Sequence, residues 1–280
     1  MQSVRRHEGV VGYYDAHPIN EDQILRALEA QGLDPGRLKP EDLLAYDQDH
    51  YGGLEANEVL IARAGLQPGH RVLDVCSGMG GPSRYIAHRV GCRVVGIDLT
   101  RSRFESAQRL TQRVGLDHLV TFVHGDALAM PFDAAEFDAV IGQEAWCHVP
   151  DKPKLIAECA RVLKPGGVIA FTDILATGAL TESDAQRLAA EMQFPVLGTL
   201  AGYEHDLRAN GFDVTSVEDL GPQWTRILVD RLAMYRHLGD ETARKFGNGR
   251  ARDWDDYYSF FVGLYELGRL TGGRFVARKR

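Results

Sequence analysis

The chain has 280 residues, of which 44% are hydrophobic and 25% charged, the composition of an ordinary soluble globular protein. Its formal net charge of −7 argues against a nucleic-acid partner, because such a partner requires a basic face. No apolar run approaches the roughly 20 residues that a membrane-spanning helix needs, and no signal-peptide pattern opens the sequence. The 4 cysteines are scattered without metal-ligand spacing. We therefore expect reduced thiols, no metal and a cytoplasmic location.

Residues 1–54 precede the region where strands begin, and their pattern predicts helices. Asn20 is placed to cap a helix that extends to Gln31, and Pro40 is placed at the start of a short second helix. A polar and aromatic stretch over 47–53 follows, directly before a helix over 55–64. We expect this first part to be a helical segment outside the sheet.

The most informative stretch is residues 71–83, RVLDVCSGMGGPS. An apolar strand is followed by a glycine turn and by Pro82, where the first turn of a helix would begin. Glycine permits positive φ and lets a ligand approach the backbone closely. The pattern predicts the first βα unit of a nucleotide-binding sheet, although a tight turn without a ligand has the same appearance.

Acidic residues end the first three predicted strands. Asp74 ends the strand at 71–75, Asp98 ends the strand at 93–98, and Asp126 follows the strand at 119–124. Asp98 lies 20 positions after Gly78, the distance at which an acid can accept the hydroxyls of a ribose. A helix cap is the alternative function for Asp98. Because open α/β sheets bind ligands at the carboxyl ends of their strands, we expect a nucleotide-type site here.

The later elements continue the alternation of strands and helices. We expect a fourth strand ending at 141–142, a fifth over 168–173, a sixth over 212–220 and an antiparallel last strand over 274–279, with helices over 151–163, 181–194 and 203–210. The stretch 221–272 has two helical patterns and predicts either a helical cap over the acceptor pocket or two helices packed on the sheet. The predicted division is 1–54 lid, 55–220 core, 221–272 cap and 273–280 final strand.

These motifs resemble those of the class I S-adenosylmethionine (SAM) methyltransferases, whose first motif usually reads D-x-G-x-G-x-G. Asp74, Gly78 and Gly80 match it, whereas Cys76 replaces the first glycine; we expect the turn to survive because cysteine is small. The resemblance implies a Rossmann-like seven-stranded sheet with an antiparallel last strand, SAM as cofactor and S-adenosylhomocysteine as product. The cofactor contacts that it implies are Asp74, Ser77, Gly78, Gly80, Asp98, Leu99, Arg103, Asp126, Ala127 and Gln143.

The turn after the fourth strand, Gln143 to His148, indicates the class of methyl acceptor. It lacks the N-P-P-Y pattern typical of many enzymes that act on nucleic acids and proteins. It resembles instead the turn of sarcosine/dimethylglycine N-methyltransferases and that of sterol and tocopherol C-methyltransferases. The text around Tyr203 and Arg226 favours the first group. We therefore predict methylation of a small glycine-derived amine, with C-methylation of a sterol-like acceptor or SAM binding without turnover as alternatives.

The resemblance also implies roles on the acceptor side. Trp146 and Tyr203 would face a methylated amine, and Arg226 would bind its carboxylate. His148, with Gln143 and Glu144, is the predicted catalytic group: it would orient the amine or take its proton, or in a sterol-like reaction Glu144 or His148 would stabilise a carbocation. Tyr51 is a candidate lid contact, as are Tyr13 and Tyr14. Core packing of Trp146 and an ordinary loop role for His148 are the alternatives.

Overall fold

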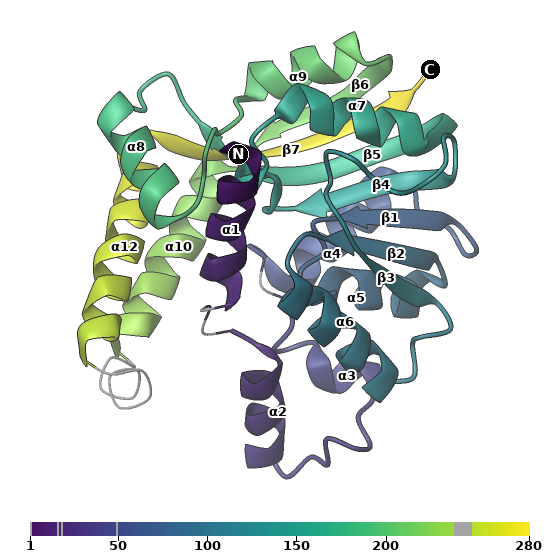
Figure 1. Cartoon of the computed structure of the whole chain (residues 1–280), viewed down its shortest axis with the longest axis horizontal. Coiled ribbons are helices and arrows are strands. Elements are labelled where there is room, and N and C mark those ends of the chain that lie inside the picture. Colours follow the sequence, from purple (N-terminus) through teal and green to yellow (C-terminus); the bar gives the residue numbers. More distant parts are fainter. Residues whose placement is uncertain (1, 16, 18, 49, 238–247) are drawn as a thin grey trace.

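The computed structural model describes residues 2–15, 17, 19–48, 50–237 and 248–280 (Figure 1). The side chains of residues 2–8, 237 and 248–254 lie outside this description. The central feature is a sheet of seven strands in the order β3-β2-β1-β4-β5-β7-β6. Its strands are β1 (Arg71–Val75), β2 (Arg93–Asp98), β3 (Val120–His124), β4 (Phe137–Gln143), β5 (Leu163–Ala176), β6 (Phe212–Asp219) and β7 (Leu270–Lys279).

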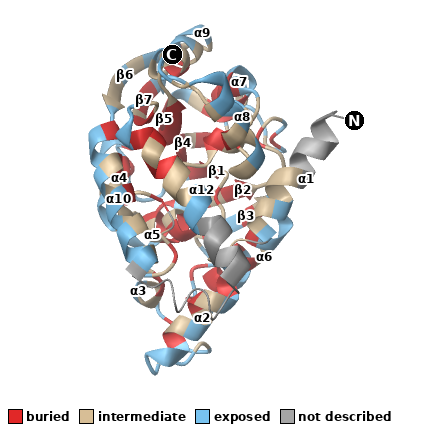
Figure 2. Ribbon diagram, turned by 90° about the vertical axis from the view of Figure 1, so that its left-hand side faces the viewer, coloured by how far each residue is buried: buried red, intermediate tan, exposed pale blue. Residues whose placement is uncertain are grey.

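The first five strands are parallel, and β7 runs antiparallel to both β5 and β6. This confirms the predicted seven-stranded fold with an antiparallel last strand. Buried residues continue without interruption along the central strands, as expected for strands covered on both faces (Figure 2). The last strand begins at Leu270, four positions before the predicted start at 274.

Alternate residues of the strands belong to two different hydrophobic clusters. Val72, Val94 and Ala139 belong to the first cluster, with apolar residues of α2 (Glu21–Ala30), α3 (Pro40–Leu43), α4 (Gly53–Ala64), α5 (Gly81–Val90) and α6 (Arg101–Arg113). Leu73 and Val140 belong to the second, with residues of α7 (Lys152–Val162) and α9 (Leu200–Ala209). Because neighbouring residues of a strand point to opposite faces, the two clusters form the two sides of a three-layer α/β/α core.

A third cluster lies at one end of the sheet. It joins α8 (Glu182–Glu191) to α10 (Gly221–His237) and α12 (Asn248–Glu266) through Leu188, Trp224 and Phe261. α10 and α12 lie side by side and also contact β7. The two predicted helices within 221–272 are thus confirmed.

The helices of the core lie close to their predicted positions. Asn20 caps α2 by accepting a hydrogen bond from the backbone N–H of Gln23, and Pro40 begins α3. A further helix, α1 (Gln2–Asp15), lies in a stretch for which no individual helix was predicted. In Figure 1 this helix lies across the end of the sheet toward which the arrow of β4 points.

Candidate active site

A cavity of about 940 Å³ lies at the carboxyl ends of the parallel strands. Loops after β1, β2 and β3 form one side of it, and this part is called the cofactor side below. The other part, the acceptor side, is formed by α1, by the loop after β4 and by the end of α8. The polar and charged part of its wall, with the nearby backbone, includes Tyr14, Asp47, His50, Asp74, Ser77, Gly78, Asp98, Leu99, Arg103, Asp126, Ala127, Gln143, Glu144, His148, Lys154 and Gln193.

The loop between β1 and α5 keeps the predicted turn. Cys76 has φ 64°, and Gly78 and Gly80 have φ 55° and 78°. A non-glycine residue in this left-handed region costs roughly 1–2 kcal/mol, so the fold stabilises Cys76 in a conformation that glycine would adopt freely. A Cβ atom on Gly80 would overlap the ring of Phe122, which explains why glycine stands there.

The three acids at the strand ends all line the cavity, but they are held differently. Asp74 is buried and accepts a hydrogen bond of 2.5 Å from the Ser83 hydroxyl, and burial raises its pKa to about 6. Asp98 accepts bonds from the backbone N–H groups of Gly78 and Thr100, each at 2.8 Å. Burial also raises the pKa of Asp98. Asp126 accepts a bond from the N–H of Leu128.

Two polar atoms of the cavity wall lack a partner among the described residues. They are the hydroxyl oxygen of Ser77 and the side-chain oxygen of Gln143, both buried. A buried polar atom without a hydrogen bond costs about 1–3 kcal/mol, so each is an atom that a bound polar ligand would stabilise. Together with the acids, these atoms fit a ligand that has hydroxyl and amino groups, as SAM does.

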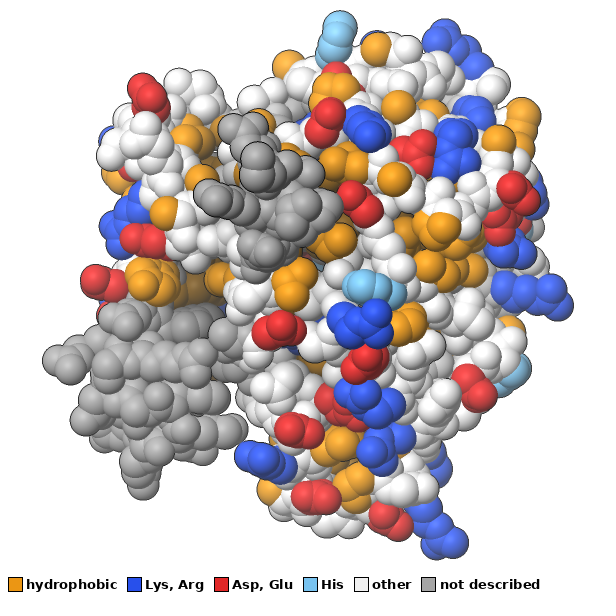
Figure 3. Space-filling model, in the orientation of Figure 1, with side chains coloured by type: hydrophobic (Ala, Val, Ile, Leu, Met, Phe, Trp, Pro, Cys, Tyr) orange, Lys and Arg blue, Asp and Glu red, His pale blue; other side chains and the backbone are white. Residues whose placement is uncertain are grey.

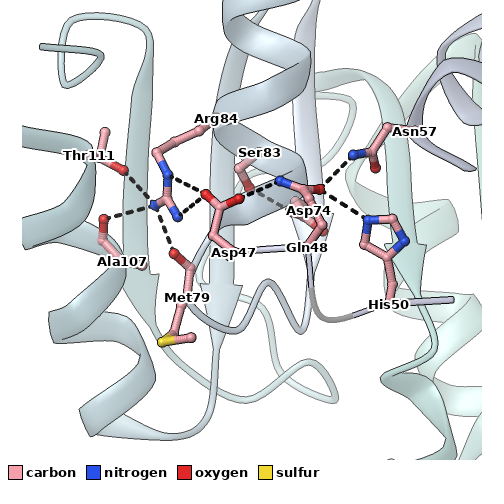
Figure 4. Close-up of polar contacts among 10 residues, drawn as sticks. All are labelled: Asp47, Gln48, His50, Asn57, Asp74, Met79, Ser83, Arg84, Ala107 and Thr111. Carbon is pink, nitrogen blue, oxygen red and sulfur yellow. Dashed lines mark hydrogen bonds and ion pairs between the residues drawn. The ribbon is translucent and has the colours of Figure 1, made fainter. Parts of the chain in front are cut away.

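A buried network ties the segment before α4 to this loop (Figure 4). Arg84 of α5 forms an ion pair of 2.9 Å with Asp47, and both side chains are almost completely buried. The same guanidinium donates to the carbonyl of Met79 and to the hydroxyl of Thr111. A Cβ atom on Gly81 would overlap the backbone carbonyl of Asp47, so the segment lies directly on the start of α5. Removing either partner alone would leave a buried charge uncompensated.

From Asp47 the network reaches the acceptor side. Gln48 donates to the Asp47 carboxylate at 2.7 Å, so its side-chain oxygen points the other way, toward Asn57 and His50. His50 Nε2 therefore donates to Gln48, and its Nδ1 lies 3.3 Å from the amide nitrogen of Gln143. A neutral His50 thus accepts a bond from Gln143 and fixes the orientation of that amide.

Glu144 is the acid of the acceptor side. Its backbone has φ 48°, a strained value for this residue type. Its carboxylate accepts bonds from the Thr172 hydroxyl at 2.6 Å and from the backbone N–H of Tyr51 at 2.5 Å. Burial raises its pKa to about 7, so Glu144 changes its charge near neutral pH.

His148 lies opposite, in contact with α1. Its Nδ1 is 3.1 Å from the backbone carbonyl of Gln193, and its Nε2 is 2.9 Å from the hydroxyl of Tyr14. Because a carbonyl can only accept, Nδ1 carries the hydrogen. Burial lowers the pKa of His148 to about 4, so the ring is neutral at physiological pH and Nε2 accepts the Tyr14 hydroxyl hydrogen. The Gln193 backbone that holds His148 has φ 57°.

Two predicted acceptor contacts are wrong because their rings belong to the core. Trp146 is completely buried, stacks on Phe171 and donates to the carbonyl of Val75 at 3.1 Å. Tyr203 is 1% exposed and donates to the buried carboxylate of Asp173 at 2.8 Å. Neither residue lines the cavity. The core-packing alternative for Trp146 is the one the structure supports.

Tyr51 and Arg226 are also placed away from the cavity wall. The Tyr51 ring packs edge-on against Trp224 and under the guanidinium of Arg231, and its lid contact stays a prediction. Arg226 is exposed on α10 and donates to the carbonyl of Pro222, so it lies outside the cavity wall where an acceptor carboxylate was expected. No described residue of α10 or α12 lines the cavity, and their role as an acceptor cap stays a prediction.

Gly80 and Tyr13 are not part of the cavity wall, whereas the remaining predicted residues line it. Ser77, Leu99, Ala127, Gln143 and His148 are among them. Arg103 also lines the cavity, and its guanidinium donates hydrogen bonds to the backbone carbonyls of Tyr14 and Ile19. Its direct contact with the cofactor stays a prediction.

Sequence reasoning missed Asp47, His50 and Gln193, and it weighed Tyr14 only as a lid contact. The polar stretch 47–53 directly before a helix is the signal that could have indicated Asp47 and His50. For Gln193 no local signal exists, because its contribution is a backbone carbonyl.

Within the described parts of the chain, no helix is long and apolar enough to cross a membrane. In the same residues, no group of three or more His, Cys, Asp or Glu side chains could hold a metal ion.

The sheet order, the antiparallel β7 and a cavity with acids at the first strand ends define an α/β protein of the methyltransferase class. The chain matches the family described as "Methyltransferase domain" over residues 73–171. The sarcosine/dimethylglycine N-methyltransferase of Halorhodospira halochloris is 33% identical to it, over 76% of this chain and 77% of that protein. The chain therefore belongs to the SAM-dependent methyltransferases and is an enzyme of that family.

Two further similarities are informative. A 24-methylenesterol C-methyltransferase 2 of Arabidopsis thaliana is 32% identical over 61% of this chain and 51% of its own length. Among solved structures, phosphoethanolamine N-methyltransferase 2 of Haemonchus contortus, with phosphomonomethylethanolamine and S-adenosylhomocysteine, has a TM-score of 0.74 and 26% identity, over 81% of this chain and 53% of that one.

Proposed function

We propose that this methyltransferase transfers the methyl group of SAM to the nitrogen of a small amine. The observation that carries this proposal is the chain of contacts from Gln193 through His148 to Tyr14 at the cavity wall. The Tyr14 hydrogen is donated to His148, so toward an acceptor the Tyr14 oxygen can only accept a hydrogen bond, and we propose that it accepts one from the N–H group of a primary or secondary amine such as sarcosine. Such a contact orients the nitrogen lone pair for in-line attack.

The cofactor side is proposed to hold SAM, which supplies the electrophilic methyl group when bound. Asp98 is the acceptor for the ribose hydroxyls and Asp126 the acceptor for the adenine amino group. The loop with Gly78 and Gly80, supported by Asp74, lies against the methionine part. The unpartnered oxygens of Ser77 and Gln143 support this assignment, since each needs a donor.

Glu144 is proposed to balance the positive charge that develops on the amine. A carboxylate with a pKa of about 7 is ionised in a large fraction of molecules at neutral pH and can also take a proton. His148 is a weaker proton acceptor, because its pKa of about 4 disfavours the charged ring. We therefore assign orientation to the Tyr14–His148 pair and charge compensation to Glu144.

The relatives support an amine as acceptor. One is named as acting on sarcosine and dimethylglycine, and the solved structure contains a phosphorylated monomethylamine. All three compounds have an acidic group besides the amine, and Lys154, an exposed cation at the cavity wall, is proposed to contact such a group in place of Arg226. C-methylation of a sterol-like acceptor is the second candidate, because a sterol C-methyltransferase is 32% identical.

We further propose that the acceptor is a small molecule, that the chain has no nucleic-acid partner and that it is located in the cytoplasm. The net charge of −7 supports the second point. Figure 3 shows acidic and basic side chains interspersed over α6 and α2 rather than a basic field, and ion pairs such as Arg109–Glu21 cross this face. The four cysteines are free thiols, which suits a reducing compartment.

The test is the release of S-adenosylhomocysteine by the purified chain with SAM. Sarcosine, dimethylglycine and phosphomonomethylethanolamine are compared with a sterol acceptor in detergent and with no acceptor. Turnover with an amine, abolished in Asp98→Ala, supports the proposal. Turnover with the sterol alone, or SAM binding without turnover of any amine, contradicts it.

A further inference from the structure

Arg103 makes contacts that the cofactor site does not require. It lies in the first turn of α6 and is 5% exposed. Its two terminal nitrogens donate to the carbonyls of Ile19 and Tyr14, at 2.7 Å and 3.0 Å. Its guanidinium carbon lies 5.2 Å from the centroid of the Tyr14 ring. One buried cation thus holds both the backbone and the ring of Tyr14.

A neighbouring contact acts in the same place. Ser102, one residue earlier on α6, donates its hydroxyl hydrogen to the carboxylate of Asp15 at 2.5 Å. The first turn of α6 therefore binds the end of α1 at two successive residues. The segment that begins α6 is itself fixed on the cofactor side, because the N–H of Thr100 donates to Asp98.

Tyr14 depends on such contacts for its position. It is supplied by a helix of 14 residues, and helices of this length are marginal when isolated. The hydroxyl of Tyr14 reaches His148 from one side while Arg103 holds its carbonyl and ring from the other. Loss of Arg103 would remove both the hydrogen bond to the Tyr14 carbonyl and the cation over the Tyr14 ring.

We propose that Arg103 is a positioning residue, which holds Tyr14 in hydrogen-bond contact with His148 and so completes the acceptor side of the site. This inference rests on the proposed function, in which the Tyr14 hydroxyl orients the acceptor. It gives Arg103 a part in acceptor turnover rather than in cofactor binding. Lysine cannot replace it, because a single ammonium group does not reproduce the planar pair of donors.

The experiment compares Arg103→Lys and Arg103→Met with Arg101→Met. Arg101 lies in the same helical turn, is exposed and pairs only at 3.5 Å with Glu105, so its variant is the matched control. Hydrogen exchange of the backbone amides of residues 10–19, with S-adenosylhomocysteine bound, requires no knowledge of the acceptor. Both Arg103 variants should exchange at least about tenfold faster there, and Arg101→Met should match the native chain.

Turnover of whichever of the three amines is methylated supplies the second measurement. Arg103→Lys should lower kcat/KM for the amine about 10- to 100-fold, because two charge-assisted hydrogen bonds lose their geometry. Its affinity for S-adenosylhomocysteine should change less than about threefold, since the charge near Asp98 is kept. The double variant Arg103→Lys with Tyr14→Phe should lower kcat/KM little more than Tyr14→Phe alone, because both substitutions disrupt the same contact of Tyr14 with His148.

Three results overturn the inference. They are unchanged exchange over 10–19 in both Arg103 variants, additive effects of Arg103→Lys and Tyr14→Phe, and a loss confined to S-adenosylhomocysteine affinity. A thermal melt of each variant shows whether the fold persists. If Tyr14→Phe alone leaves turnover intact, the proposed function of Tyr14 fails, while the exchange measurement still decides whether Arg103 holds the segment.

Discussion

The two sides of the cavity are built in different ways. On the cofactor side, the functional groups come from the loops after three consecutive strands, and Asp98 bonds to Gly78 only 20 positions away. On the acceptor side, Tyr14 meets His148 across 134 positions, and His148 meets Gln193 across 45. This difference explains why the binding site of a methyl donor is easier to recognise in a sequence than that of a methyl acceptor. The donor site is made of local motifs, whereas the acceptor site exists only after distant segments have folded together.

The largest effect is expected at the acceptor side, from Tyr14→Phe. The variant keeps the ring under Arg103 but removes the oxygen that we propose orients the amine, so kcat/KM for the amine should fall about 10²- to 10³-fold. S-adenosylhomocysteine affinity, measured by calorimetry, should remain within about threefold. An equal loss in cofactor affinity would remove the distinction between the two sides.

On the cofactor side, Asp98→Ala should reduce affinity for S-adenosylhomocysteine about 100-fold. The variant removes the proposed ribose acceptor and also frees the N–H groups of Gly78 and Thr100. The loss should be the same with every acceptor. Calorimetric titration measures it, and a variant that binds normally but fails with one acceptor only would contradict the assignment.

Glu144→Gln should have a smaller effect that depends on pH. Glu144 has a pKa of about 7, so the native kcat/KM should rise as the carboxyl ionises through that pH. The variant should lack this inflection and be about tenfold slower at pH 8, equivalent to about 1.4 kcal/mol. A pH profile from 5.5 to 9 tests this, and an unchanged inflection in the variant would assign it to another group.

Protonation of His148 gives an effect on stability with a defined sign. Its folded pKa of about 4 is below its ordinary value of 6.5, so the unfolded chain binds more protons between these values. The contribution of the neutral His148 ring to the free energy of unfolding is therefore complete above pH 6.5 and is lost as pH falls toward 4. His148→Gln should reduce that loss by at most about 3 kcal/mol. Urea unfolding of both proteins at pH 5 and 7 measures it, and an identical change with pH in both would contradict the assignment.

The smallest effect is expected from Arg226→Ala. Because Arg226 is exposed on α10 and absent from the cavity wall, kcat/KM for every amine should stay within about twofold of the native value. Lys154→Ala is the variant to compare with it, and it should raise KM for amines that carry an acidic group. A loss of kcat/KM for one amine only with Arg226→Ala would instead indicate that Arg226 contacts that acceptor.

Much of the fold could be predicted from the sequence, and the reason is local. The strand from 93 to 98, the helix capped by Asn20 and the glycine turn after Asp74 each depend on residues close in the chain. Cys76 shows the limit of a motif: the turn kept its shape although the usual glycine is absent.

Aromatic residues near the site could not be assigned in the same way. Trp146 and Tyr203 have the side chains that an amine pocket needs, but those same rings also stabilise a core, and only packing decides between the two uses. α1 was overlooked because it is stabilised by contacts made after folding, such as those from Arg103 to Tyr14.

The sequence alone was sufficient for the methyltransferase fold and for the carboxylates at the ends of its first strands, because short-range patterns specify both. The tertiary structure decided which side chains line the cavity. Trp146, Tyr203 and Arg226 lie outside its wall, whereas Tyr14, Glu144 and His148 are part of it. The physical reason is that burial and long-range hydrogen bonds, which set the pKa values of Glu144 and His148, arise only when separate segments pack together.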